Sequence, residues 1–235
     1  MNKIWHFGWN TGNQDASQAV RVQKELHALK ARPNFLSAWL RNPIQVGAVL
    51  PSSNGLTSTM AAQTEEGSGI TIELGAGTGA VTSALLTRGI RPNRLVLIEK
   101  DRILAQELSQ HFPHLRVLQG DAARLKTLLQ REEMGVVDNV VSSLPLLNMR
   151  HRTRVRILKH IFTVLRPEGK FVQFTYSLRP PITERLAHSL GVNGERTDRI
   201  LLNLPPAHVW VYRRRSIITS PYLSRTAARQ PTDSA

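Results

Sequence analysis

Short apolar runs alternate with amphipathic segments through the middle of the chain, from residue 69 to residue 176. Five strands are expected from runs rich in aliphatic and β-branched residues, at 69–74, 94–100, 115–120, 136–143 and 170–176. Helices are expected between them, at 79–89, 101–112 and 150–165, with Asp101 as an N-cap. Nearly continuous apolar strands that alternate with helices indicate a parallel sheet covered by helices on both faces.

The end of this region follows a different pattern. Residues 199–212, RILLNLPPAHVWVY, form two apolar runs joined by a short turn at Pro205-Pro206, with no room for a crossover helix. Two strands joined so closely must be antiparallel. The expected fold is therefore α/β and Rossmann-like, with seven strands, mostly parallel, and an antiparallel last strand. The chain is expected to divide into a flexible start, amphipathic helices, this domain and a flexible tail, at 1–15, 16–50, 51–216 and 217–235.

The charge of the chain bears on its partners. The formal net charge is +14 and the sequence pI is about 11.2. A surplus of this size favours an anionic partner, either nucleic acid or the negatively charged face of a membrane, with a merely solubilising surface as the alternative. No run approaches the roughly twenty apolar residues that span a bilayer, and the first residues lack an apolar segment of the secretory type.

Cysteine is absent from the chain. Disulfides and thiolate metal sites are therefore excluded, which fits a reducing cytosol. No other spacing typical of a metal site is present, and we expect no metal.

A glycine-rich turn follows the first expected strand. In the segment ELGAGTG a strand gives way to a helix, and glycines there let the backbone turn tightly and approach a ligand closely. The candidate ligand-binding residues of this turn are Glu73, Gly75, Ala76, Gly77, Thr78 and Gly79. A dinucleotide is the usual competing ligand, and a turn without a ligand is the other alternative.

Two further acidic residues follow the next two strands. Glu99 ends the second strand, where a carboxylate can bind both hydroxyls of a ribose, and Asp121 follows the third, where it can accept from an adenine amino group. Taken alone, either acidic residue could instead be a solvated turn residue or a helix cap. Together with the glycine turn they define one crevice at the carboxyl ends of the strands. Lys100, Ala122 and Ser142 complete the candidate cofactor-binding residues.

These residues resemble the pattern of the class I S-adenosylmethionine-dependent methyltransferases, over about residues 50–215. The glutamate directly before the glycine turn favours this family over the dehydrogenases, and the antiparallel closing hairpin belongs to it as well. The resemblance implies that S-adenosylmethionine is the cofactor. It also implies that Glu73 and the turn Gly75–Gly79 face the methionine moiety, Glu99 the ribose and Asp121 the adenine.

The fourth strand ends in Ser143-Leu144-Pro145-Leu146, which in this family lies beside the reacting methyl group. Adenine and amide-nitrogen methyltransferases carry Asp/Asn-Pro-Pro-aromatic or Asn-Leu-Pro-Tyr there, which holds a planar amino group and stacks on the base. The leading asparagine and the aromatic residue are missing here. A flat base would therefore find neither a hydrogen-bond acceptor nor an aromatic side chain to stack on. We expect the site to admit an aliphatic amine on an apolar body instead. An ordinary loop that enters a helix is the alternative.

Four segments together resemble the bacterial phospholipid N-methyltransferases: GAVLPSS at 47–53, SSLPLLNM at 142–149, FVQFTYS at 171–177 and NLPPAHVWVYRR at 203–214. The resemblance implies methylation of the amine of phosphatidylethanolamine, in up to three steps, towards phosphatidylcholine. Related members act on ornithine lipids, and these segments do not separate the two head groups. Ribosomal RNA adenine dimethylases are close in fold and are the further alternative.

The segment DASQAVRVQKELHALKAR, residues 15–32, has apolar residues at helical spacing, while Arg21 and Lys24 face the other way. Trp39 lies in a second apolar cluster that follows. A basic amphipathic helix with a nearby tryptophan fits one that lies in a bilayer interface, and a helix that caps the core is the alternative. The resemblance implies that this segment docks on an anionic membrane and covers the active site. We expect a cytoplasmic enzyme, peripherally associated with the inner membrane, with nucleic acid disfavoured as a partner.

Side chains beside the expected methyl position are candidates for the reaction. An amine needs its lone pair to react, whereas a lysine-like ammonium titrates near about 10, so the site must desolvate the ammonium or take its proton. Tyr176 is the candidate for contacting the amine, and its face would favour methylated cations. Arg179 is the candidate for a lipid phosphate and His151 for accepting the proton, with Ser143 and Leu144 beside the methyl group. A core tyrosine, a solvated arginine and a histidine without a role are the respective alternatives.

Overall fold

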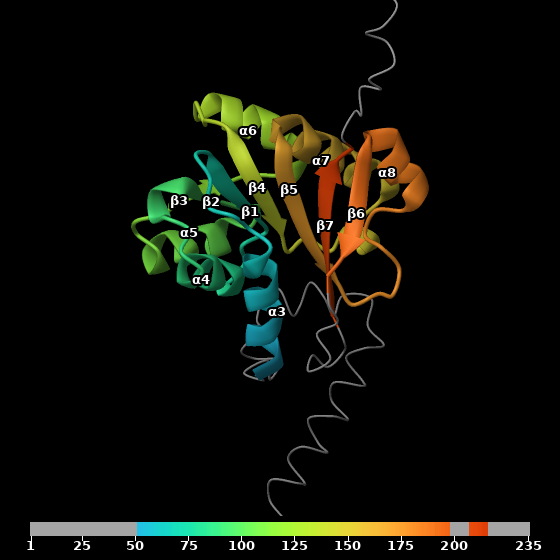
Figure 1. Ribbon diagram of the computed structural model, residues 1–235. Helices are drawn as coiled ribbons and strands as arrows, with labels where there is room; N and C mark the ends of the chain where they lie inside the picture. The colour runs from blue at the N-terminus through green and yellow to red at the C-terminus, as the bar shows by residue number, and fades with distance from the viewer. Residues whose placement is uncertain (1–50, 198–206, 216–235) are drawn as a thin grey trace, which may run out of the picture.

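The computed structural model describes residues 51–197 and 207–215. Within these ranges the chain forms one twisted sheet with helices on both sides (Figure 1). Several expectations fall on residues outside the described ones: the N-terminal helices with Arg21, Lys24 and Trp39, the strand at 199–204 and the tail at 217–235.

Among the described residues, seven strands form the sheet, in the order β3-β2-β1-β4-β5-β7-β6. Their bounds are β1 (Ile70–Leu74), β2 (Leu95–Glu99), β3 (Arg116–Gln119), β4 (Val137–Ser142), β5 (Leu165–Thr175), β6 (Val192–Arg196) and β7 (His208–Arg214). β7 runs antiparallel to both of its neighbours, and all other neighbouring pairs are parallel (Figure 1). The predicted Rossmann-like sheet with an antiparallel last strand is confirmed.

The sixth strand of the described sheet was not predicted from the sequence. In the described part of the chain this strand is Val192–Arg196, and the predicted strand at 199–204 lies outside the described residues. β6 is an edge strand in which only Val192 is buried, so it lacks an alternating apolar pattern. Gly194 lies against Tyr212, whose ring would come within 2.3 Å of an added Cβ. A polar edge strand that contains glycine resembles a loop at the level of sequence.

In the described ranges, α3 precedes β1, and five further helices and three short 3-10 turns lie between the strands. The helices are α3 (Pro51–Ala62), α4 (Ala80–Thr87), α5 (Arg102–His111), α6 (Leu125–Arg131), α7 (His151–Val164) and α8 (Glu184–Leu190), and the turns are η1 (Pro92–Arg94), η2 (Ala122–Arg124) and η3 (Leu146–Asn148). The predicted helices correspond to α4, α5 and α7. Asp101 caps α5 as predicted, because its carboxylate accepts from the N–H groups of Ile103 and Leu104.

Two buried clusters lie on the two faces of the sheet. One contains residues of α3, α4 and α5, and the other contains residues of α6, α7 and α8. The division follows from the two-residue period of a strand. In β1, Ile72 and Leu74 belong to the α7 side, whereas Glu73 points to the α4 side and contacts Thr82.

The parallel strands β1 to β5 end at the same edge of the sheet, here called the carboxyl edge. β1 lies between β2 and β4, so the turn after β1 and the loop after β4 leave the sheet side by side. Open α/β sheets bind ligands at such a switch point. Within the described ranges no helix has the length and apolar character needed to cross a membrane.

Candidate active site

The glycine turn after β1 depends on a backbone that other residues rarely adopt. Gly75 has φ +71°, in the left-handed region, and its N–H donates to the carbonyl of Ile98 at 2.8 Å. An added Cβ at Gly75 would also come within 2.8 Å of Leu144 Cδ2. The turn after β1 and the loop after β4 therefore approach so closely that only glycine fits at this position.

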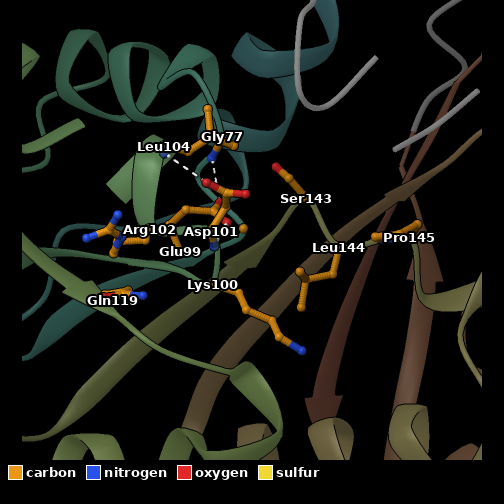
Figure 2. Close-up of a pocket in the computed structure, with 11 residues that line it drawn as sticks. Gly77, Glu99, Lys100, Asp101, Arg102, Leu104, Gln119, Ser143, Leu144 and Pro145 are labelled. Atoms are coloured by element: carbon orange, nitrogen blue, oxygen red, sulfur yellow. Dashed lines mark hydrogen bonds between the residues drawn. The ribbon is translucent and has the colours of Figure 1, made fainter. Parts of the chain in front are cut away.

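Glu99, the last residue of β2, is held by both carboxylate oxygens. Oε2 accepts from the N–H of Gly77 at 3.0 Å, and Oε1 accepts from the N–H of Asp101 at 2.9 Å. Figure 2 marks the bond from Gly77 to Glu99, which joins the glycine turn to the end of β2. The side chain is therefore fixed in direction at the mouth of the crevice, where it is 8% exposed.

A cavity of about 540 Å³ opens at the carboxyl edge beside Glu99. Its lining comes from the turn after β1, the ends of β2 and β3, the start of α5 and the loop after β4: Gly75, Gly77, Glu99, Lys100, Asp101, Arg102, Leu104, Gln119, Ser143, Leu144 and Pro145. Figure 2 shows Leu144 and Pro145 across the cavity from Glu99 and Arg102. The size lies in the range of roughly 300–1,000 Å³ that small-molecule sites occupy.

The loop after β4 is held by hydrogen bonds on both sides. The N–H of Ser143 donates to Leu74 at 3.0 Å, and the carbonyl of Leu144 accepts from Nε2 of Gln173 at 3.0 Å. Ser142 Oγ accepts from the N–H of Leu144 at 3.2 Å. Leu146 is 2% exposed and belongs to the core on the α7 side. The side chain at position 146 thus packs inward instead of presenting a face to the cavity.

Comparisons with known proteins agree with this geometry. Residues 72–169 match the family model described as a methyltransferase domain. The structure of 1,6-didemethyltoxoflavin-N1-methyltransferase from Burkholderia thailandensis, which contains S-adenosylhomocysteine, has a TM-score of 0.56 and 15% identity over 81% of this chain and 89% of that one. Residues 72–169 therefore form a methyltransferase domain of the class I, S-adenosylmethionine-dependent type.

Two curated relatives differ in the substrates that their names give. The ornithine lipid N-methyltransferase of Singulisphaera acidiphila is 29% identical over 145 residues, which are 60% of this chain and 76% of that protein. The ribosomal RNA small subunit methyltransferase A of Mesorhizobium japonicum is 28% identical over 206 residues, which are 82% of this chain and 69% of that protein.

The cavity of the methyltransferase suits its cofactor. Each carboxylate oxygen of Glu99 has about two lone-pair sites, so it can accept a ribose hydroxyl in addition to its backbone N–H. The glycine turn supplies backbone at the cavity wall without side chains. Glu99, Gly75 and Gly77 would hold S-adenosylmethionine, which supplies a methyl group on a positively charged sulfur.

Lys100, which lines the cavity, forms an ion pair with Asp121. Lys100 Nζ lies 2.8 Å from Asp121 Oδ2, and Asp121 Oδ1 accepts from the N–H of Ala123 at 2.8 Å. Burial raises the pKa of Asp121, but Lys100, the Ala123 N–H and Arg124 outweigh it, so the pKa lies below its ordinary value. Asp121 is therefore an anion at neutral pH. Its contact with adenine stays a prediction, because Lys100 rather than Asp121 lines the cavity.

Glu73 lies beneath the turn and not in the cavity wall. It is fully buried, and its Oε2 accepts from Thr82 Oγ1 at 2.6 Å, while Oε1 makes no hydrogen bond to any described residue. Burial raises the pKa of Glu73 to about 8, the Thr82 bond counteracts this, and the nearby Glu99 adds to it. Glu73 is therefore mostly protonated at neutral pH. Its role towards the methionine moiety stays a prediction.

The remaining cofactor candidates are not among the residues that line the cavity. Ala76 and Ala122 are buried in the clusters on opposite faces of the sheet, and Thr78 is exposed. Gly79, with φ +84°, begins α4. Ser142 is fully buried and acts on the loop through its hydroxyl.

Of the candidates for the reaction, Ser143 and Leu144 line the cavity, whereas Tyr176, His151 and Arg179 do not. Tyr176 packs edge-to-face on Phe174, with ring centroids 5.5 Å apart, and burial raises its pKa. His151 is exposed as the first residue of α7, and Arg179 is exposed in the loop after β5. All three lie at the carboxyl edge, outside the set of residues that line the cavity. Their roles towards a substrate stay predictions.

Sequence reasoning missed several residues of the site. Gln119 pairs with Glu99 across β2 and β3 and lines the cavity, as do Arg102 and Leu104 at the start of α5. Their signal was their position after β2 or at the end of β3. Gln173 had no such signal, because its partner Leu144 lies 29 residues away in the chain. Among the described residues, no group of three or more histidine, aspartate or glutamate side chains could hold a metal ion.

Proposed function

We propose that this methyltransferase transfers methyl groups to the primary amine of phosphatidylethanolamine, in up to three steps towards phosphatidylcholine. The reaction takes place at the cytoplasmic face of the membrane, with which the protein associates peripherally. The N-terminal segment with Arg21, Lys24 and Trp39 assists docking under this proposal, as its basic amphipathic pattern suggests.

The observation that carries the proposal is the form of the loop after β4. Base methyltransferases need an aromatic face at the position of Leu146, and here that side chain is 2% exposed in the core. The cavity wall on this side consists of Leu144 and Pro145, with Ser143 beside them. Such a wall offers apolar contact to an acyl-linked head group and no stacking platform for a nucleobase.

The chemistry requires an uncharged amine. An alkylammonium has a pKa near about 10.4, so most of it is protonated at neutral pH. An apolar wall of Leu144 and Pro145 favours the neutral form by desolvation. The nitrogen lone pair then forms the bond to the methyl carbon, the carbon–sulfur bond breaks with its electron pair left on sulfur, and the proton goes to water or to a nearby base. His151, exposed at the start of α7, is our candidate for that base.

Ornithine lipid is the second candidate acceptor. The relative from Singulisphaera acidiphila, at 29% identity over 76% of its length, is named for that substrate. Ornithine lipid also carries a primary amine on an acylated body, so the features described above fit both lipids.

Adenine in ribosomal RNA is the candidate from another substrate class. The relative from Mesorhizobium japonicum, at 28% identity over 206 residues, favours it, and so does the net charge of +14. The buried Leu146 argues against it, because base–aromatic stacking contributes about 1–3 kcal/mol per base in nucleic-acid sites.

A transfer assay with labelled S-adenosylmethionine separates the three candidates. The full chain is incubated with micelles of phosphatidylethanolamine, with micelles of ornithine lipid or with ribosomal RNA, and the products are resolved by chromatography. We expect label in mono-, di- and trimethylated phosphatidylethanolamine. The variant Glu99→Gln should lose transfer to every acceptor, whereas Glu107→Gln, an exposed residue of α5, should not. Label only in ornithine lipid would correct the head group, and label only in RNA would overturn the proposal.

A further inference from the structure

The two edges of the sheet differ in how their cations are paired. The described residues form six ion pairs, and five of them lie towards the edge at which the parallel strands begin: Arg91–Glu66, Arg116–Glu132, Arg166–Asp138, Lys170–Glu65 and Arg213–Glu195. Further arginines at that edge, Arg94, Arg214 and Arg215, donate to backbone carbonyls. Most cations of this edge are thus bound to carboxylates or backbone carbonyls of the protein itself.

Four of the exposed arginines at the carboxyl edge have no such partner. Arg102, Arg150, Arg152 and Arg179 are all exposed, and none of their side chains forms an ion pair or hydrogen bond with the described part of the chain. The one ion pair at this edge joins Lys100 to Asp121. The described domain therefore carries free positive charge around the cofactor cavity, while Arg88 and Arg131 are also exposed without such a partner at the opposite edge.

Helix stability does not account for two of these arginines, Arg102 and Arg152. Arg102 is the first residue of α5, and Arg152 is the second residue of α7, which has no acidic residue in its first turn. A cation at a helix N-terminus destabilises the helix, because the free N–H groups there are already positive. Residues that oppose local stability at an exposed edge point to an external anionic partner.

Exposed apolar side chains accompany the arginines. Ile103 is 65% exposed and Leu178 is 76% exposed, and they are two of the three large apolar side chains that the described residues expose. Ile103 directly follows Arg102, and Leu178 directly precedes Arg179. The third, Val136, lies at the opposite edge, before β4.

The six residues surround the cavity. Arg102 and Ile103 follow β2, Arg150 and Arg152 follow β4, and Leu178 and Arg179 follow β5. In the order β2-β1-β4-β5 the outer strands are separated by about 14 Å, from a spacing of about 4.8 Å between neighbours. The cavity, with Arg102 and Pro145 in its wall, opens between them.

We propose that Arg102, Ile103, Arg150, Arg152, Leu178 and Arg179 form a docking rim that places the mouth of the cavity on an anionic bilayer. The arginines contact lipid phosphates, and the two aliphatic side chains enter the interface. Isolated aliphatic residues beside cations fit a bilayer surface, whereas single-stranded RNA sites use aromatic platforms, which the rim lacks. The proposal of the docking rim rests on the proposed lipid substrate in one respect. If the substrate is a lipid, the rim explains how its head group reaches the cavity without leaving the membrane.

Vesicle sedimentation of the full chain tests the rim. The vesicles are phosphatidylcholine with or without phosphatidylglycerol, and the main variant is Arg150→Gln/Arg152→Gln. Its matched control is Arg88→Gln/Arg131→Gln, which removes the same charge from two exposed arginines at the opposite edge. We expect the rim variant to lose about 30-fold in partition to anionic vesicles, at about fivefold for each arginine, and the control to lose much less.

Separate aspartate variants, with a control at the opposite edge, test the apolar part of the rim. Ile103→Asp and Leu178→Asp should each lower vesicle binding severalfold, whereas Val136→Asp, at the opposite edge, should not. Thermal unfolding followed by circular dichroism checks that each variant is folded. Equal losses of vesicle binding in the rim and control variants, or no loss in either, would overturn the proposal of a docking rim. So would a rim variant that loses affinity for a ribosomal RNA fragment and keeps its affinity for vesicles.

Failure of the rim and failure of the proposed function give different results. Methyl transfer is measured in parallel with phosphatidylethanolamine in detergent micelles, where docking to a bilayer is not required. Normal transfer in micelles together with unchanged vesicle binding of the rim variants contradicts the rim alone. Vesicle binding that depends on the rim without transfer to any lipid contradicts the proposed substrate alone.

Discussion

Replacement of Gly75 by alanine tests the close approach of the glycine turn and the loop after β4. Gly75 has φ +71°, and an added Cβ would come within 2.8 Å of Leu144 Cδ2. Gly191, after α8, has nearly the same backbone, φ +65°, but a Cβ there would meet nothing within 4 Å. The variants Gly75→Ala and Gly191→Ala therefore separate backbone strain from the contact with Leu144.

The two variants should differ in stability and in cofactor affinity. A left-handed backbone costs a non-glycine residue about 1–2 kcal/mol, so Gly191→Ala should lower the free energy of unfolding by that amount. Gly75→Ala adds overpacking against Leu144, which costs about 1–3 kcal/mol more. Because Leu144 lines the cavity, relief of the contact moves Leu144 or the turn into the space of the cofactor. We expect the affinity for S-adenosylhomocysteine to fall about 10- to 100-fold, which is about 1.4–2.8 kcal/mol.

Titration calorimetry with S-adenosylhomocysteine and urea unfolding measure the two quantities. The double variant Gly75→Ala/Leu144→Ala removes the obstructing side chain and should recover part of the affinity relative to Gly75→Ala. Coupling energies between contacting residues are about 0.5–3 kcal/mol, so this recovery is measurable. Equal stability losses in Gly75→Ala and Gly191→Ala, with cofactor affinity kept in both, would refute the reasoning.

Three further predictions concern single residues of the site. Glu99→Gln should lower the affinity for S-adenosylhomocysteine about 10- to 100-fold, because hydrogen bonds to a charged group contribute about 1.5–3 kcal/mol, and calorimetry should show no such loss for Glu107→Gln. Between about pH 5 and 8 the folded protein keeps a proton on Glu73 that the unfolded chain releases, so the free energy of unfolding should fall as pH rises, by up to about 1.4 kcal/mol per unit. Urea titrations of Glu73→Gln over this range should lack that slope; a slope as steep as in the parent chain contradicts the buried proton. Gln173→Leu removes the donor to the Leu144 carbonyl and should lower kcat about five- to tenfold with little change in cofactor affinity, and a loss confined to cofactor affinity contradicts a positioning role.

Features with a local cause could be predicted from the sequence. The turn after β1 follows from three glycines between a strand and a helix, and the cap at Asp101 follows from a carboxylate one residue before α5. Glu99 directly follows the apolar run of β2, so the sequence indicates that it lies at the carboxyl edge. In each case the decisive interaction joins residues a few positions apart or lies at the end of an apolar run.

Features that depend on distant parts of the chain could not be predicted. β6 is recognisable only beside β7, because its sequence is polar and Gly194 is there to accommodate Tyr212. Gln173 acts on Leu144 across two strands, which no spacing reveals. The side chain of Leu146 turns inward because the core on the α7 side accepts it, and the sequence indicates only that it is not aromatic.

The composition also could not predict which arginines form ion pairs and which are free. The net charge of +14 favours an anionic partner but does not say where it binds. The three-dimensional arrangement separates arginines such as Arg166, paired with Asp138, from arginines such as Arg152, which has no partner in the described part of the chain.

A competition reaction tests the acceptor most directly. Labelled S-adenosylmethionine, the full chain, anionic vesicles that contain phosphatidylethanolamine, and ribosomal subunits without methylated adenines are combined in one tube, and the label is counted in the lipid and RNA fractions. The account predicts that the label enters the lipid fraction as methylated phosphatidylethanolamine and that the RNA stays unlabelled. Label in the RNA with unlabelled lipid would contradict it.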